Sequence, residues 1–216
     1  MTNEEYAEQI QPIINNLIKQ RQEMGNIAKE IIGHNLFIED LFFCTSADRC
    51  TGLIDGFINM LEQRNLTCVG ALLRLQMDNC LRTYAAFIAQ DKKAVVHCII
   101  DGAQINKQKD NQGKFLSDEH LKDRITKEID PQFRQVYDQA SGYIHLSSKA
   151  FYQMIDEIKD NSINFQVGLA LPEKRNPVLI EAANAFFHFV KLHQKLLFAV
   201  VESKRRTDAE LENTGN

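Results

Sequence analysis

Several residue types are scarce in this 216-residue chain, and each scarcity excludes a class of protein. Tryptophan is absent, and the four prolines and ten glycines are too few for a loop-rich β-sandwich. Lysine and arginine (25) are outnumbered by aspartate and glutamate (29), so the net charge of −4 provides no overall cationic surface for nucleic acid. No apolar run approaches the roughly 18 residues that a membrane span needs, so we expect no membrane partner.

Cysteine is also sparse, and its spacing is not that of a metal site. The five cysteines are odd in number and form no C-x-x-C pair: Cys44, Cys50, Cys68, Cys80 and Cys98. Such residues are typical of buried free thiols in a reducing compartment, with zinc binding or catalysis as alternatives. The opening residues, MTNEEYAEQI, are acidic and lack the pattern of a secretory signal. We therefore expect a cytoplasmic protein.

The abundant residues indicate a helical core. Apolar residues make up 44% of the chain, which excludes a disordered protein. Between about 3 and 32 they recur every three or four residues, which predicts one long helix with a buried stripe of Ile10, Ile13, Leu17, Met24, Ile27 and Ile31. Gly33 is its expected C-terminal stop. A rod of roughly 45 Å either frames a bundle or reaches a second subunit, and we predict a homodimer through it.

Further helical periods fill most of the remaining chain. A second helix is expected at about 36–63 with a break near Thr45 and Ser46, a third at 67–90, and shorter ones at 92–105, after Ser117 and after Asp130. The third is apolar around most of its circumference, so it should be the central helix. A last helix is expected to begin at Asn176 and to run to about 204.

The segment 151–171 has a different period. Ile163, Phe165, Val167, Leu169 and Leu171 alternate with other residues, which predicts a strand. Residues 151–158 are then its hairpin partner, or else a short helix capped by Ser147 or Ser148. We therefore predict a mostly α, single-domain protein of about six or seven helices. It consists of a long first helix (about 3–32), a core bundle (about 36–204) with this small hairpin, and a frayed tail (205–216).

The third expected helix carries a stripe of charge. Arg74, Asp78 and Arg82 are four residues apart, so they share one face of a helix that is otherwise apolar. In this arrangement Asp78 lies between two guanidinium groups, and one positive charge is left over. That surplus charge favours an anion as ligand, such as a phosphate, an RNA backbone or a carboxylate. The alternatives are a structural ion triad and a solvated helix edge.

A second group of polar residues follows at Tyr137, Ser141, His145 and Ser148, which line one face if the helix is continuous. These side chains suit a contact at a helix end, a ligand or RNA contact, or proton transfer. His188 and His193 are five residues apart and cannot share a metal face. The sequence contains no zinc, dinucleotide, phosphate-loop or hydrolase motif, so we predict neither a metal nor a cofactor.

Together, LLRLQMDNCLRTYAAF and YDQASGYIHLS resemble a set of uncharacterised bacterial helical proteins over about residues 50–200. Both segments are also distantly similar to the HEPN superfamily of helical bundles. That resemblance implies dimerisation, and its nuclease members occur in bacterial defence and toxin–antitoxin systems. The nuclease motif is an Arg followed by four to six residues and then a His. Here those positions before His145 are Asp138, Gln139 and Ala140, so the motif is not present as such.

Three functional hypotheses follow. The leading one is a non-enzymatic interaction or binding protein, which the HEPN resemblance links to bacterial defence. The second is a divergent ribonuclease with Arg74, Arg82 and His145 as catalytic candidates. The third is a sensor of a small anionic ligand. The predicted binding residues are Arg74, Asp78, Arg82, Tyr137, Ser141 and His145, with RNA or a small anion as the partner.

Overall fold

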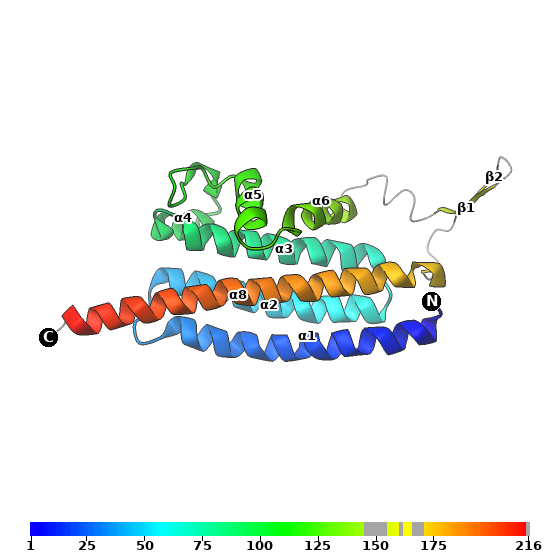
Figure 1. Cartoon of the computed structure of the whole chain (residues 1–216), viewed down its shortest axis with the longest axis horizontal. Helices are drawn as coiled ribbons and strands as arrows, with labels where there is room; N and C mark the ends of the chain where they lie inside the picture. Colours follow the sequence, from blue (N-terminus) through cyan, green and yellow to red (C-terminus); the bar gives the residue numbers. More distant parts are fainter. Residues whose placement is uncertain (145–154, 160–161, 166–170, 215–216) are drawn as a thin grey trace.

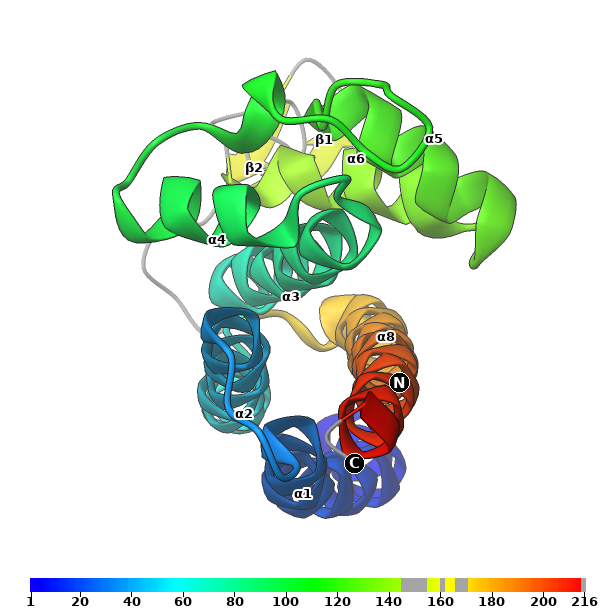
Figure 2. The same cartoon turned by 90° about the vertical axis from the view of Figure 1, so that its left-hand side faces the viewer.

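A computed structural model describes residues 1–144, 155–159, 162–165 and 171–214. Four long helices lie side by side: α1 (Asn3–Ile32), α2 (Ile38–Glu62), α3 (Leu66–Ile88) and α8 (Asn176–Thr214) (Figure 1). Figure 2 views them end-on as a ring in the order α1, α2, α3, α8, and each helix contacts both of its neighbours. The prediction of a mostly α bundle is confirmed.

Helix α1 has the bounds expected from its periodicity. At its start, the Thr2 hydroxyl accepts a hydrogen bond from the backbone of Glu5 (3.1 Å), and the Glu5 carboxylate accepts one from the backbone of Thr2 (2.8 Å). At its end, Gly33 adopts a φ of 55°, which favours glycine. The apolar stripe of α1 is buried, and α1 packs on α2 and α8 of the same chain. The long helix therefore frames the bundle.

Helices α2 and α3 form one side of the ring. The expected break in α2 near Thr45 and Ser46 is wrong, because the helix is continuous. The Thr45 hydroxyl donates to the carbonyl of Leu41 (2.8 Å), so this side chain is satisfied within the helix. Helix α3 packs against α2, α4, α5, α6 and α8, which confirms its central position.

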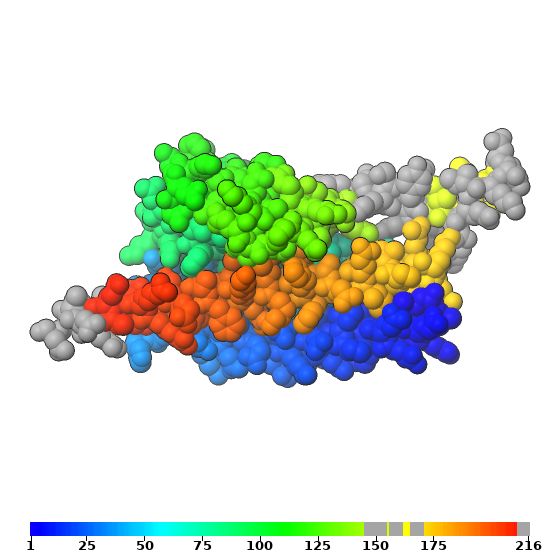
Figure 3. Space-filling model, viewed as in Figure 1, coloured from blue at the N-terminus to red at the C-terminus, as the bar shows by residue number. Residues whose placement is uncertain are grey.

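An outer layer covers α3, made of α4 (Lys92–Ile100), the 3₁₀ turn η1 (Ile105–Lys107), α5 (Asp118–Glu128) and α6 (Phe133–Ile144). The space-filling view shows this layer resting on the long helices (Figure 3). Helix α4 ends at Ile100 and not near 105, because the chain turns at Gly102 with a φ of 69°. Helix α6 approaches α3 closely at Gly70, where an added β-carbon would overlap the ring of Tyr143.

Two short strands follow, β1 (Ile155–Lys159) and β2 (Ser162–Phe165), which pair antiparallel with Ile158 opposite Ile163. They lie within the segment where alternation predicted a hairpin. The alternative of a short helix over 151–158 is wrong where the chain is described, because residues 155–158 belong to β1. Its expected caps, Ser147 and Ser148, and the strand positions Val167 and Leu169 fall outside the described residues.

After the 3₁₀ turn η2 (Glu173–Arg175), helix α8 continues to Thr214, so the expected end near 204 is wrong. The physical reason is tertiary contact. The buried carboxylate of Asp208 accepts a hydrogen bond from the side chain of Asn35 (3.1 Å), in the turn between α1 and α2. In the described ranges, none of the helices has a stretch long and apolar enough to cross a membrane.

Candidate functional site

The charged stripe on α3 is divided between two different partners. Arg74 lies 2.5 Å from Asp78 (Nη1 to Oδ2) and faces α6, where its Nε donates to the hydroxyl of Ser141 (3.2 Å). Its Nη2 donates to the hydroxyl of Tyr137, which in turn donates to Asp78 (3.2 Å). The guanidinium carbon lies 3.5 Å from the centroid of the Tyr137 ring. Four of the predicted binding residues therefore form one closed network that joins α3 to α6.

Arg82 is not part of this network. Its Nη2 lies 2.8 Å from a carboxylate oxygen of Asp118, in the first turn of α5. The expectation that Asp78 is held between two guanidinium groups is therefore wrong, and Asp118 neutralises the charge that was predicted to be in surplus. The spacing along α3 determines which residues share a face, but the partner of Arg82 comes from a segment whose approach the spacing does not reveal.

Burial controls the ionisation of the tyrosine in this network. Desolvation raises the pKa of Tyr137, and the neighbouring charge of Asp78 raises it further, while Arg74 acts in the opposite direction. The hydroxyl therefore stays protonated and remains a hydrogen-bond donor to Asp78. Because only 12% of the Arg74 side chain is exposed, this cation is enclosed by protein groups and has little surface left for a ligand.

The predicted face of α6 is described only in part. Tyr137 and Ser141 contact Arg74, and the described part of the helix extends to Ile144. His145 and Ser148 lie outside the described residues. The predicted approach of His145 to Arg74 or Arg82 therefore stays a prediction.

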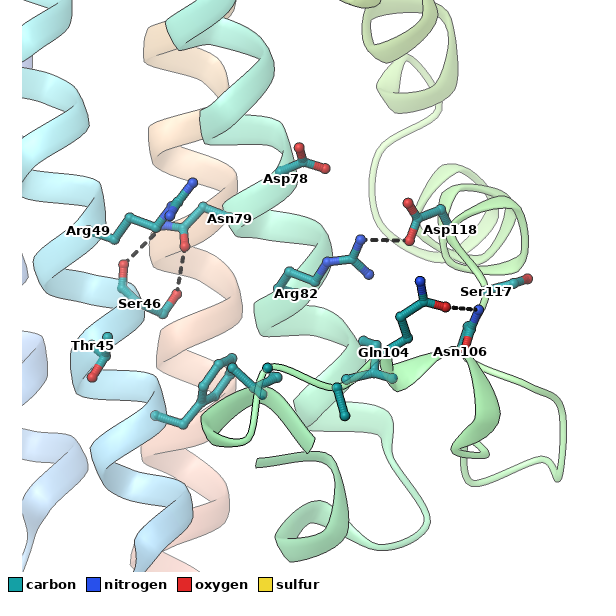
Figure 4. A pocket seen from close by; sticks show the side chains of 15 residues that line it. Thr45, Ser46, Arg49, Asp78, Asn79, Arg82, Gln104, Asn106, Ser117 and Asp118 are labelled. Atoms are coloured by element: carbon teal, nitrogen blue, oxygen red, sulfur yellow. Dashed lines mark hydrogen bonds and ion pairs between the residues drawn. The ribbon is translucent and has the colours of Figure 1, made fainter. Parts of the chain in front are cut away.

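A pocket of about 730 Å³ opens beside the stripe, between α2, α3 and the segment that joins α4 to α5 (Figure 4). Asp78 and Arg82, two of the predicted residues, line it, whereas Arg74, Tyr137 and Ser141 are not among its lining residues. The lining is mixed in polarity and consists of Phe42, Thr45, Ser46, Arg49, Asp78, Asn79, Arg82, Ile99, Gly102, Ala103, Gln104, Ile105, Asn106, Ser117 and Asp118.

Arg49 is one of the pocket residues that the sequence did not reveal as binding residues. It is exposed on α2, and within the described part of the chain its guanidinium has no hydrogen-bond or ion-pair partner. A signal for it exists in the sequence: Phe42, Thr45, Ser46 and Arg49 are three or four residues apart and so share one face of α2. Nothing in the sequence indicates that this face meets the stripe on α3.

Ser46 brings a buried polar cluster to the wall of the pocket. Its hydroxyl lies 2.8 Å from Nε2 of His193 on α8 and also contacts the hydroxyl of Thr83. The amide of Asn79 donates to the backbone carbonyl of Ser46 (3.0 Å), so its oxygen faces the Ser46 hydroxyl at 3.2 Å. All four side chains are buried. The cluster holds the Ser46 hydroxyl in one orientation at the pocket.

This serine and histidine do not form an activated nucleophile. Burial lowers the pKa of His193 to about 3, so the imidazole is neutral and a weak base. Among the described residues, its Nδ1 has no hydrogen-bond partner, so no carboxylate orients the ring. The Ser46 hydroxyl also faces the side-chain oxygen of Asn79 at 3.2 Å, and this oxygen competes with the imidazole for its proton.

Over the ranges that the structure describes, no group of three His, Cys, Asp or Glu side chains is placed to hold a metal ion. The five cysteines are free, and burial raises the pKa of both Cys50 and Cys80. These two thiols are therefore protonated and inert at neutral pH.

In comparisons with known proteins, no family model, no curated protein and no solved structure matches the chain. The resemblance to the HEPN superfamily therefore stays a prediction, and the geometry of the pocket carries the functional argument.

Proposed function

We propose that this protein is a non-enzymatic binding protein whose pocket between α2, α3 and the α4–α5 segment takes a small polar molecule with one anionic group. The observation that carries the proposal is Arg49, a cation on the pocket wall that no acidic side chain of the described residues neutralises. An anionic group of the ligand supplies the missing counter-charge.

A count of the charges in and beside the pocket indicates the sign of the ligand's charge. Asp78 is neutralised by Arg74, which is not a lining residue, and Arg82 is neutralised by Asp118. Arg49 is then the remaining charge, so the lining together with Arg74 carries one net positive charge. Guanidinium groups bind carboxylates and phosphates through paired hydrogen bonds, which favours these two groups as the anion.

The rest of the lining indicates the size and polarity of the ligand. The volume of about 730 Å³ is in the range of pockets that hold small metabolites. Phe42, Ile99 and Ile105 provide an apolar wall, whereas the side-chain amides of Gln104 and Asn106 provide hydrogen-bonding groups. A ligand with an apolar body, a polar edge and one anionic group matches this distribution.

The absence of an activated Ser46 supports binding over catalysis, because neutral His193 does not take up the serine proton. The five free cysteines support the proposed bacterial cytoplasmic location, where thiols stay reduced.

A homodimer through α1 remains part of the proposal. Since the apolar stripe of α1 is buried within the chain, the dimer contact uses its outer face, where Ile18 is exposed. A molar mass of one chain, measured by light scattering, would exclude the homodimer.

The test of the pocket is a titration with inorganic phosphate at constant ionic strength, followed by two-dimensional NMR of the wild type, Arg49→Gln and Arg206→Gln. Arg206 is an exposed arginine on α8 outside the pocket, so its variant has the same net charge as Arg49→Gln. We expect saturable shifts of pocket amides in the wild type and in Arg206→Gln, and a loss of saturation in Arg49→Gln. Equal binding by all three proteins overturns the proposal, because phosphate then binds elsewhere.

A further inference from the structure

Two ion pairs that differ in exposure contribute residues to the pocket lining. Arg74 and Asp78 are 12% and 30% exposed, and hydrogen bonds from Tyr137 and to Ser141 support their contact. Arg82 and Asp118 are 37% and 51% exposed, and Nη2 of Arg82 lies 2.8 Å from Oδ1 of Asp118. Exposed pairs of this kind contribute little to stability. The Arg82–Asp118 pair is therefore the one that a ligand can open at low cost.

The position of this pair gives it a function. Figure 4 shows Arg82 extending from α3 toward Asp118 at the start of α5, so the contact spans two walls of the pocket. The carboxylate of Asp118 occupies the place at Arg82 where an external anion would bind. The negative charge of Asp118 remains stabilised when Arg82 is removed from it, because Asp118 lies in the first turn of α5 and the N-terminus of a helix stabilises a carboxylate.

We propose that Asp118 is a built-in competitor: its carboxylate holds Arg82 in the ligand-free protein, and the anionic group of the ligand replaces it. This inference rests on the proposed function of the pocket. Exchange of one anion for another leaves the charge at Arg82 compensated. Arg49 lines the same pocket and has no acidic partner among the described residues, so its charge attracts the anionic group of the ligand in addition to Arg82, while Asp118 returns to solvent. The exchange therefore favours the ligand.

The competitor sets the affinity of the site and links the ligand to α5. Because the ligand has to displace Asp118 before it contacts Arg82, removal of this carboxylate increases affinity. An exposed ion pair corresponds to about a two- to fivefold change in a binding constant. Displacement also frees the first turn of α5 from α3, so the ligand changes the environment of this turn.

The experiment measures the dissociation constant of inorganic phosphate for Asp118→Asn and for the control Asp138→Asn. Asp138 on α6 has a similar exposure of 55%, is also paired with a cation, Lys122, and lies outside the pocket lining. We expect Asp118→Asn to bind phosphate about two- to fivefold more tightly than the wild type, and Asp138→Asn to bind as the wild type does. Equal or weaker binding by Asp118→Asn overturns the inference.

A double variant separates competition from a general effect of charge. In an Arg82→Gln background Asp118 has no cation to occupy, so Asp118→Asn should no longer improve affinity. If the improvement persists in that background, the gain is a long-range charge effect and the competitor role is wrong.

Arg49→Gln distinguishes the two proposals. If it abolishes phosphate binding while Asp118→Asn leaves affinity unchanged, the pocket function stands and the competitor role falls. If Arg49→Gln binds normally, both fall.

Discussion

The ammonium group of Lys204 on α8 lies 2.5 Å from the carboxylate of Asp40 in the first turn of α2, and both side chains are buried. Lys204 also donates to the backbone carbonyl of Asn35, in the turn that joins α1 to α2. This ion pair therefore ties the C-terminal half of α8 to the α1–α2 turn, and it explains why α8 remains ordered beyond residue 204.

We predict that Lys204→Met is strongly destabilising because it leaves the buried charge of Asp40 without its partner. Loss of one member of a buried pair typically costs about 3–5 kcal/mol. Urea unfolding measures the change, and the double variant Asp40→Asn/Lys204→Met should recover part of it. The control is Arg205→Met, since the neighbouring Arg205 forms only exposed pairs and its loss should cost less than about 1 kcal/mol. Similar losses for Lys204→Met and Arg205→Met would contradict this assignment.

The buried imidazole of His193 should make stability depend on pH. Its pKa is lowered to about 3 by burial, whereas a histidine in an unfolded chain titrates near 6.5. Between these values only the unfolded chain binds the proton, so stability is fully present above about pH 6.5 and falls as the pH decreases. The contribution of this one site approaches about 1.4 kcal/mol per pH unit.

Urea unfolding at a series of pH values between 7 and 5 tests this dependence. We expect His193→Gln to show a smaller slope of unfolding free energy against pH than the wild type, whatever its absolute stability. The exposed His97 provides the matched control, because His97→Gln removes an imidazole that lies at the surface. An unchanged slope in His193→Gln would mean that this histidine is not buried in its neutral form.

The contact between Gly70 and the ring of Tyr143 predicts the effect of a single methyl group. In Gly70→Ala the new β-carbon overlaps the ring, so α6 has to move away from α3. Overpacking of this kind costs about 1–3 kcal/mol. Gly25→Ala is the control, because no atom lies within 4 Å of its added β-carbon on α1 and alanine favours the helix by up to about 1 kcal/mol. In thermal unfolding we expect a lower melting temperature for Gly70→Ala and a higher one for Gly25→Ala. A higher melting temperature for Gly70→Ala would disprove the close approach.

The helices were predictable where local signals agree. Helix α1 combines a capping box, a regular apolar stripe and a terminal glycine, and its expected and observed bounds coincide. Helix α8 ends in a polar stretch with no such stripe, and its continuation depends on the contacts of Lys204 and Asp208 with the α1–α2 turn. A periodicity argument cannot detect that support, since the partners are distant in the sequence.

For the candidate site, the sequence by itself determined that Arg74, Asp78 and Arg82 share a face of the most apolar helix, because residue spacing along a helix sets the direction of each side chain. Tertiary structure alone decided how these charges are paired: Arg74 with α6, Arg82 with α5, and Arg49 with no acidic partner in the described ranges. Ion pairs depend on separations of a few ångströms between elements, and those separations arise only when the helices pack.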